Sequence, residues 1–378
     1  MDGTTTTTFA LHELPLVLTR EDPEAWLLVG MVRARNAVIR ADWGHDDFGG
    51  TEQETFSDLQ HQRYTRRRRV VAVVDGADGD PDRVVGYARL DLPLQENTHT
   101  GYADVGVRPE HRGRGIGAAL HAAAVELARG DGRTKLVAET DHAVEPPEGP
   151  GALSAPTGSG RVPADAPSVR FAQGHGWRLE QVVRHSRLHL PVPADVLETH
   201  RAAALERAGA DYRLVQWQDA CPEAWVEQFA LLNTRMSTDV PLGGLDLEED
   251  RWDAERVRRV EEQVLARGEH LLTSAVEHVP TGTLVAFSSF QVPGHSDEFV
   301  WQGDTLVLKE HRGRRLGMLV KIAQLDLLAR ALPSVRRIST WNAEENSWML
   351  AINVALGFRP EGCVGEWQAE LSAAPARD

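Results

Sequence analysis

One stretch of this chain occurs twice, and that repeat constrains the fold more than any other feature. VGVRPEHRGRGIGAALHAAAVEL covers residues 105–127, and TLVLKEHRGRRLGMLVKIAQLDL covers residues 305–327, so matched positions lie 200 residues apart. Each copy has the pattern of a short apolar strand, a turn rich in Arg and Gly, and an amphipathic helix. The same register joins Val85 to Val285 and Thr140 to Thr340 outside the stretch. A register shared over such a length indicates duplication of a whole domain.

The repeat predicts an α/β chain with two tandem domains. We expect an N-terminal domain at 1–192, a linker helix at 193–210 and a C-terminal domain at 211–378. The closing glycines of the two halves, Gly176 and Gly357, lie only 181 positions apart, so the first half contains 19 additional residues. Those residues belong to segment 143–166, whose Pro and Gly content predicts a long irregular loop.

The turn between strand and helix has the composition of a phosphate-binding loop. The first turn of a helix leaves backbone N–H groups without partners at the positive end of the helix dipole. A diphosphate can accept those hydrogen bonds where glycine lets the backbone come close, and Arg112 and Arg114 can add charged contacts. A glycine-rich turn with solvated arginines is the alternative. The occurrence of the full strand, loop and helix context in both halves favours the phosphate-binding interpretation.

The composition excludes several classes of protein. The chain has 41 basic and 56 acidic residues, a net charge of −15, which argues against a general nucleic-acid or acidic-membrane binder. Two cysteines form no metal motif and no disulfide framework, so we expect a cytoplasmic protein without a metal. No apolar run is long enough to span a membrane.

The motif Arg112 to Gly117, RGRGIG, resembles the R/Q-x-x-G-x-G/A signature of the GCN5-related N-acetyltransferases (the GNAT superfamily). The resemblance covers both halves and includes the closing Leu356-Gly357-Phe358, matched by His175-Gly176-Trp177. The chain is similar to the tandem, two-domain members found in actinobacteria. This implies two GNAT-like domains, each a mixed, splayed β-sheet flanked by helices.

The resemblance also implies a co-substrate, acetyl-CoA or another acyl-CoA. Its pyrophosphate would lie on the loop amides, and its pantetheine arm would bind the main chain of the central strand. That main chain would also polarise the thioester carbonyl. The cofactor-binding residues implied are Val105, Val107, Arg112, Gly113, Arg114, Gly115, Gly117, Thr305, Val307, Arg312, Gly313, Arg314, Arg315, Gly317 and, opening the last helix, Asn342.

The sequence departs from the family pattern in ways that affect catalysis. Arg315 replaces the first glycine of the second signature, where it would either crowd the pyrophosphate or bind the 3′-phosphate. The tyrosine that often serves as general acid is replaced by Ala172 and Asn353. Asp104 and Asp304, beside the cofactor segments, are therefore the candidate catalytic carboxylates. Structural or solvated carboxylates are the alternative, because strand alternation places both side chains on the opposite face from the cofactor segment.

These features predict an N-acetyltransferase that moves an acetyl group from acetyl-CoA directly to a primary amine of a small molecule. We expect no nucleic-acid or membrane partner, and we expect the chain to be a monomer or a homodimer. A non-catalytic acyl-CoA-binding, sensing or scaffold protein is the alternative. The missing tyrosine favours that alternative, whereas the regularity of both loops favours an enzyme.

Overall fold

The computed structural model describes residues 8–76 and 79–371, and they form two compact units. Unit 1 contains the chain up to Gln181 together with the segment from Val364 onward. Unit 2 contains Val182–Cys363. Within the described residues, no helix is both long and apolar enough to cross a membrane.

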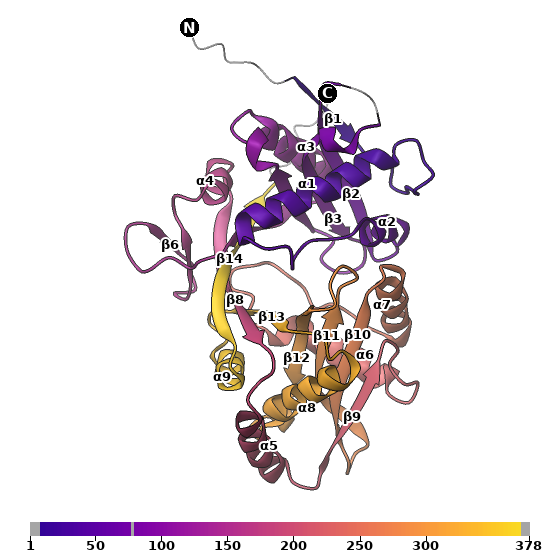
Figure 1. Ribbon diagram of the computed structural model, residues 1–378, viewed down its shortest axis with the longest axis vertical. Coiled ribbons are helices and arrows are strands. Elements are labelled where there is room, and N and C mark those ends of the chain that lie inside the picture. Colours follow the sequence, from indigo (N-terminus) through magenta and orange to yellow (C-terminus); the bar gives the residue numbers. More distant parts are fainter. Residues whose placement is uncertain (1–7, 77–78, 372–378) are drawn as a thin grey trace. The chain divides into compact units, whose positions relative to one another are not determined.

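Unit 1 alternates helices with strands (Figure 1). Its elements, with the short 3-10 turns labelled η, are β1 (Phe9–Glu13), α1 (Ala25–Trp43), α2 (Glu52–Gln60), β2 (Thr65–Val74), η1 (Pro81–Arg83), β3 (Val84–Pro93), β4 (Thr100–Val107), η2 (Pro109–His111), α3 (Ile116–Gly130), β5 (Lys135–His142), β6 (Ala152–Ser154), β7 (Arg161–Pro163), α4 (Pro167–Gly174) and the start of β8 (Arg178–His189).

Unit 2 repeats this order after a connecting helix. Its elements are the remainder of β8, α5 (Ala194–Ala208), β9 (Tyr212–Gln218), α6 (Val226–Asp239), α7 (Ala254–Ala266), β10 (His270–His278), β11 (Thr283–Val292), β12 (Phe299–Val307), η3 (Lys309–His311), α8 (Leu316–Ala331), β13 (Arg337–Ala343), α9 (Ser347–Leu356) and the start of β14 (Arg359–Glu370).

Helices cover both faces of the sheet in unit 1, because successive side chains of β2 point to opposite sides. Val71 packs with Leu28 and Met31 of α1, whereas Val70 packs with Leu120 of α3. In unit 2 the central helix α8 is buried on several sides, since α5 packs against it as well as the sheet. The sheets thus hold the start of α3 and of α8 in fixed positions.

The central strands separate from their parallel neighbours in both units. β4 pairs with β5 only over Thr100–Ala103, although its antiparallel pairing with β3 continues to Val107. β12 likewise pairs with β13 only over Phe299–Trp301. The carboxyl-terminal parts of β4 and β12 therefore have no strand partner on that edge within the described residues. This is the mixed, splayed sheet that the sequence predicts.

The last strand of each unit comes from the other half of the chain. The sheet of unit 1 runs β1-β2-β3-β4-β5-β14, and that of unit 2 runs β8-β13-β12-β11-β10-β9. β8 pairs with β13 in register from Val183 to His189, and Trp367 of β14 donates a hydrogen bond from Nε1 to Thr140 Oγ1 of β5 at 2.9 Å. This exchange differs from the expected boundaries of 1–192 and 211–378, because those boundaries keep each terminal strand in its own half.

The predicted irregular loop at 143–166 contains regular structure. β6 and β7 form an antiparallel hairpin, with Leu153 opposite Val162. Val162 is fully buried and packs close to Gly365 of β14. The sequence did not indicate these two short strands, because the Gly and Pro residues around them occur both in irregular loops and at the turns of hairpins.

Candidate functional site

The phosphate-binding loop of unit 1 has the backbone that the sequence predicts. Gly113 and Gly115 adopt positive φ angles of 76° and 82°, which glycine takes without steric cost. A Cβ atom built on either residue meets nothing within 4 Å, so a ligand can approach the backbone. Gly115 is the N-cap of α3 and has no side chain to satisfy the first amides of the helix. The loop therefore fits a diphosphate.

The loop of unit 2 follows the same path despite its altered sequence. Gly313 has a φ of 76°, equal to that of Gly113, and Arg315 takes the left-handed conformation of Gly115 with a φ of 58°. This conformation costs a residue with a Cβ atom about 1–2 kcal/mol. The chain thus retains the backbone of the loop at a cost in stability.

The first arginine of each loop is held by the protein. Nε of Arg112 donates to the carbonyl oxygen of Val107 at 3.0 Å, and Nε of Arg312 donates to that of Val307 at 3.0 Å. Arg112 also contacts Asp42 at 3.3 Å, and Arg312 contacts Asp239 at 2.9 Å. These arginines fasten the loop to the end of α1 or α6.

Arg114 and Arg314 lie on the outer side of their loops. Arg114 is exposed, and one of its Nη atoms donates to the Glu110 carbonyl at 3.0 Å. The guanidinium of Arg314 lies over the ring of Tyr212, 5.6 Å from its centroid. Their predicted contacts with the phosphates remain predictions.

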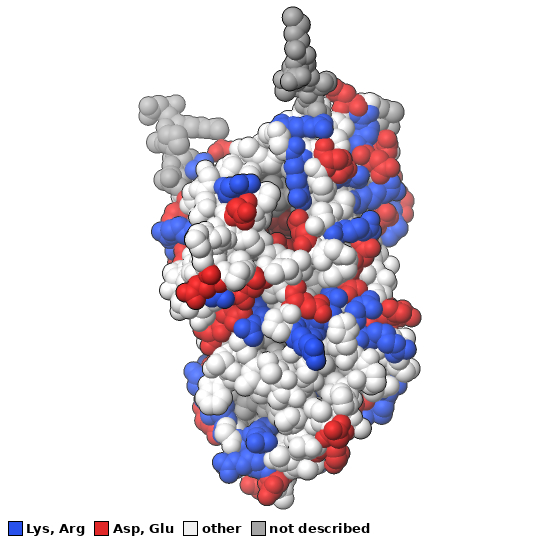
Figure 2. All heavy atoms as spheres, turned by 60° about the vertical axis from the view of Figure 1, so that its left-hand side comes forward, with Lys and Arg blue, Asp and Glu red and all other residues white. Residues whose placement is uncertain are grey.

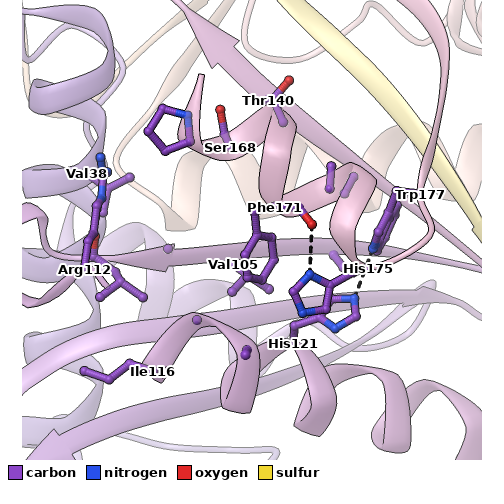
Figure 3. A pocket seen from close by; sticks show the side chains of 18 of the residues that line it. Val38, Val105, Arg112, Ile116, His121, Thr140, Ser168, Phe171, His175 and Trp177 are labelled. Atoms are coloured by element: carbon purple, nitrogen blue, oxygen red, sulfur yellow. Dashed lines mark hydrogen bonds between the residues drawn. The ribbon is translucent and has the colours of Figure 1, made fainter. Parts of the chain in front are cut away.

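A cavity of about 580 Å³ connects the loop of unit 1 with the splay between β4 and β5. Its lining includes Val105, Val107 and the loop glycines, as the sequence predicts, together with Glu139 of β5. In Figure 3, Arg112 and Val38 lie at one side of the cavity, and a group of aromatic residues lies at the other.

The aromatic end of this cavity is formed by α3 and α4. Nε1 of Trp177 donates to Nε2 of His121 at 3.0 Å, and Nδ1 of His175 donates to the Phe171 carbonyl at 2.8 Å (Figure 3). Burial, and then the neighbouring His175, lower the pKa of His121 to about 4. His121 is therefore a neutral hydrogen-bonding group at pH 7.

Two carboxyl groups of β5 have pKa values close to neutral pH. Burial raises the pKa of Glu139 to about 7, helped by the charges of Glu366 and Asp104. Burial also raises the pKa of Asp141 to about 7, helped by Glu139 and Asp104 and opposed by a hydrogen bond from Trp43. Glu139 is nevertheless open to solvent, because it lies in a concave wall that reduces hydration without excluding water. Such groups are suited to acid–base catalysis near neutral pH.

Another acidic residue of unit 1 lies at the same cavity. Asp42 lines the same cavity, and burial raises its pKa in spite of the opposing charge of Arg112. Figure 2 shows acidic side chains in and beside a hollow in the surface of unit 1. Titratable carboxyl groups therefore gather at this part of the cavity.

Asp104 and Asp304 do not line the cavities. The Asp104 carboxylate lies 3.5 Å from Arg89 and 3.8 Å from Arg35, with 47% of its side chain exposed. It acts on the site through its charge, which raises the pKa of both β5 carboxyl groups. Burial raises the pKa of Asp304. The strand alternation noted in the sequence accounts for both placements.

The sequence reasoning missed Glu139 and Asp141, although the sequence holds a signal for them. Both are acidic, both follow the buried residues of β5, and their spacing of two places them on one face of the strand. The matched positions of the second half are Ser339 and Trp341. A comparison of the halves outside the glycine loop would have revealed this difference.

Unit 2 contains a larger cavity of about 800 Å³. It extends from the loop along β12 to α9. Four residues predicted to bind the cofactor line this one cavity: Gly313, Arg315, Thr305 and Val307. Trp348 of α9 lies at this cavity with 85% of its surface exposed.

The splayed strand of unit 2 offers hydrogen-bonded and aromatic side chains in place of carboxylates. Ser339 is fully buried, and its Oγ lies 3.0 Å from Nε2 of His185 in β8. The ring of His185 in turn lies 5.0 Å from that of Trp341. This part of unit 2 is packed and keeps no carboxylate at the positions of the β5 pair.

The sequence predicts that Asn342 opens the last helix, and this prediction is wrong. Asn342 lies in β13, and its Oδ1 accepts a hydrogen bond from Nδ2 of Asn353 at 2.7 Å. The helix begins at Ser347, and its N-cap is Asn346, whose side chain accepts from the Met349 amide at 3.3 Å. Asn346 lines the cavity of unit 2. The run of polar residues after β13 concealed where the strand ends.

Comparisons with known proteins agree with this geometry. The Acetyltransferase (GNAT) family model matches residues 39–146. A tandem GNAT protein from the clavulanic acid biosynthesis pathway is 27% identical, with a TM-score of 0.72 over 97% of this chain and 100% of that one. No curated protein matches the sequence.

Two more distant structures share the fold. A GCN5-related N-acetyltransferase from Sphaerobacter thermophilus is 14% identical, with a TM-score of 0.57 over 98% of this chain and 97% of that one. The glucosamine N-acetyltransferase region of a fungal multi-domain GH3 β-N-acetylglucosaminidase is 15% identical, with a TM-score of 0.58 over 96% of this chain and 38% of that one.

The splayed sheets and the glycine-containing loops are thus features of the GNAT fold. Residues 39–146 match the GNAT family, and the chain as a whole is similar to a tandem GNAT protein. Proteins of this family are acetyltransferases that use acetyl-CoA.

Proposed function

We propose that unit 1 transfers an acetyl group from acetyl-CoA to a primary amine of a small molecule, with Glu139 as the general base. The observation that supports this proposal is the position of Glu139, which lines the cavity between the phosphate-binding loop and the splay. Its pKa of about 7 lets the carboxylate and the acid coexist at neutral pH. Positioning and proton transfer are the two contributions that such a site can make.

The reaction proceeds by direct attack. The Glu139 carboxylate accepts a proton from the amine as its nitrogen forms a bond with the thioester carbonyl carbon. The C–S bond then breaks, and the CoA thiolate takes up the proton held by Glu139, directly or through water, which restores the carboxylate. The free edge of β4 is the part of the backbone that can donate to the carbonyl oxygen. Both cysteines, Cys221 and Cys363, are buried in unit 2, which favours direct transfer over a thioester carried on unit 1.

The negative charge around the cavity supports a cationic acceptor. Asp42 and Glu139 line the cavity, Asp141 follows on the same face of β5, and burial raises the pKa values of all three carboxyl groups. A bound ammonium group would stabilise their ionised forms, and the ionised base could then deprotonate it. An amine with a second positive charge fits this surface better than an anionic amino acid.

A second function is favoured for unit 2, namely binding of an acyl-CoA without transfer. The backbone of its loop and its splay match those of unit 1. Ser339 and Trp341 stand where unit 1 has its two titrating carboxylates. The donor site is therefore retained at a place where the proposed base is missing.

Release of free CoA thiol from acetyl-CoA tests the proposal, with aminoglycosides, polyamines and amino acids as acceptors. Gly115→Glu should abolish release, since it places a carboxylate against the diphosphate, and the equivalent substitution Arg315→Glu should leave release unchanged. The φ of 58° at Arg315 shows that this backbone position accepts a long side chain. Loss of activity in Arg315→Glu alone would move the chemistry to unit 2. Thermal stabilisation by acetyl-CoA without release on any amine would favour binding alone.

A further inference from the structure

The lining of the cavity of unit 2 combines polar loop residues with apolar side chains. Gly313 and Arg315 lie next to the first turn of α8. Three methionines of separate helices, Met236 of α6, Met318 of α8 and Met349 of α9, also line the cavity. Methionine is flexible and polarisable, so it adapts to apolar ligands of differing shape. This combination suits a ligand with an anionic head and an apolar tail.

Apolar residues surround the one carboxylate of unit 2 that matches an acidic lining residue of unit 1. Asp239 pairs with Arg312 as Asp42 pairs with Arg112, which fixes the correspondence between α6 and α1. Next to Asp239 the cavity is lined by Met236, Val240 and Pro241.

The β5 carboxylates have no counterpart on this side of unit 2. Ser339 and Trp341 occupy the matched positions, and Ser339 is buried in its contact with His185. Asp239 and Glu345 do line the cavity of unit 2, but the counterpart of Glu139 is missing there, so this side lacks a carboxylate that the proposed acceptor side of unit 1 has.

We propose that unit 2 binds an acyl-CoA whose acyl chain is a linear hydrocarbon longer than acetyl, with the chain in the methionine-lined part of the cavity. The proposal rests on the function suggested above for unit 2 and specifies its ligand. The cavity holds about 800 Å³, compared with about 580 Å³ in unit 1, so it has room for additional methylene groups. Trp348 at the rim adds exposed aromatic surface that a hydrocarbon chain can cover.

Isothermal titration calorimetry with acetyl-, butyryl- and octanoyl-CoA tests this proposal on the full-length protein. The Gly115→Glu variant reports on unit 2, because its unit 1 loop is blocked, and Arg315→Glu reports on unit 1. Each fully buried methylene strengthens binding about fourfold, so burial of about three of the six methylenes that octanoyl adds should make octanoyl-CoA bind unit 2 about 50-fold more tightly than acetyl-CoA. The same comparison at unit 1 should give less than about a threefold difference, since its acceptor side is charged.

Met236 provides the matched substitutions. In the Gly115→Glu background, Met236→Gln should weaken octanoyl-CoA binding about tenfold and leave acetyl-CoA binding nearly unchanged, because it puts an amide beside the chain. Met236→Leu keeps an apolar side chain of similar volume and should preserve the dependence on chain length.

The outcomes separate this inference from the function on which it rests. Equal affinity of unit 2 for acetyl- and octanoyl-CoA would overturn the inference and leave the binding function standing. Failure of unit 2 to bind any acyl-CoA in the Gly115→Glu variant, with normal binding at unit 1 in Arg315→Glu, would overturn both. A dependence on chain length that survives Met236→Gln would place the chain elsewhere and also contradict the proposal.

Discussion

The two units share a donor loop but differ on the side where an acceptor would bind. In unit 1 the loop faces a splay that carries Glu139 and Asp141, and in unit 2 the matched strand carries Ser339 and Trp341. The loop tolerates even the change from Gly115 to Arg315, because recognition of a diphosphate depends on backbone amides. Acid–base chemistry depends on individual side chains, so on the proposed function the two substitutions on this strand would suffice to remove it.

The strand exchange contributes to this difference. The strand beside β5 is β14, which brings Glu366 near Glu139, and the strand beside β13 is β8, which brings His185 to Ser339. The charge of Glu366 raises the pKa of Glu139, whereas His185 forms a hydrogen bond with the buried Ser339. The acidity of the unit 1 site therefore depends on a strand from the other end of the chain.

The largest expected effect comes from the base itself. Glu139→Gln should lower kcat about 10²–10⁴-fold, the usual contribution of a positioned general base. Ser339→Ala is the matched control in unit 2 and should leave kcat unchanged. Steady-state kinetics with the best amine of the panel provides the measurement. A Glu139→Gln variant with kcat within threefold of the wild type would transfer the role to Asp141 or Asp104.

Trp367 tests whether the exchanged strand stabilises unit 1. Its side chain is 1% exposed and bonds to Thr140, so Trp367→Ala should lower the free energy of unfolding by about 3–5 kcal/mol. The matched residue in β8 is Ser186, which is buried but small, so its replacement by Ala should change the free energy of unfolding by less than about 1 kcal/mol. Urea unfolding followed by circular dichroism distinguishes the two variants. Equal small losses would show that β14 contributes little to unit 1.

The duplication and the phosphate-binding loop could be predicted from sequence, because glycine spacing and helical period are local signals. The splay of β4 and β5 followed from the family resemblance and is confirmed. The exchange could not be predicted, since β8 and β14 have similar strand patterns and only long-range pairing decides which sheet each joins. The role of Glu139 also depends on spatial neighbours, because its acidity is set by burial and by Glu366, which is distant in sequence.

The pH dependence of kcat/KM is the next test of whether unit 1 has a titrating base that unit 2 lacks. With a pKa of about 7, Glu139 should gain basic activity as pH rises, so the ratio of kcat/KM between wild type and Glu139→Gln should rise about tenfold per pH unit below 7 and level off above it. The ratio removes the titration of the amine, which is common to both proteins. A ratio that stays flat from pH 5.5 to 8 would contradict the assignment of the base.

The same pKa has a consequence for stability. The carboxyl group of Glu139 is protonated more readily in the folded protein than in the unfolded chain. Its contribution to the free energy of unfolding is therefore fully present below about pH 4.5 and is lost as the pH rises through about 7. The Glu139→Gln variant should therefore lose less stability than the wild type between pH 5 and 8. Thermal unfolding at the two pH values measures this difference.

The smallest expected effect concerns the loop that the units share. Arg315→Gly removes the left-handed strain of about 1–2 kcal/mol, offset by the greater freedom of glycine in the unfolded chain, about 0.5–1 kcal/mol. We therefore expect a gain in stability of about 0.5 kcal/mol, and a similar loss for Gly115→Arg, both measurable by urea unfolding. Binding of acetyl-CoA to unit 2 should change less than about threefold in Arg315→Gly, since the amides of the helix start hold the diphosphate. If binding falls more than tenfold, the Arg315 side chain itself contacts a phosphate, and the second loop recognises its ligand by a side chain that the first loop does not possess.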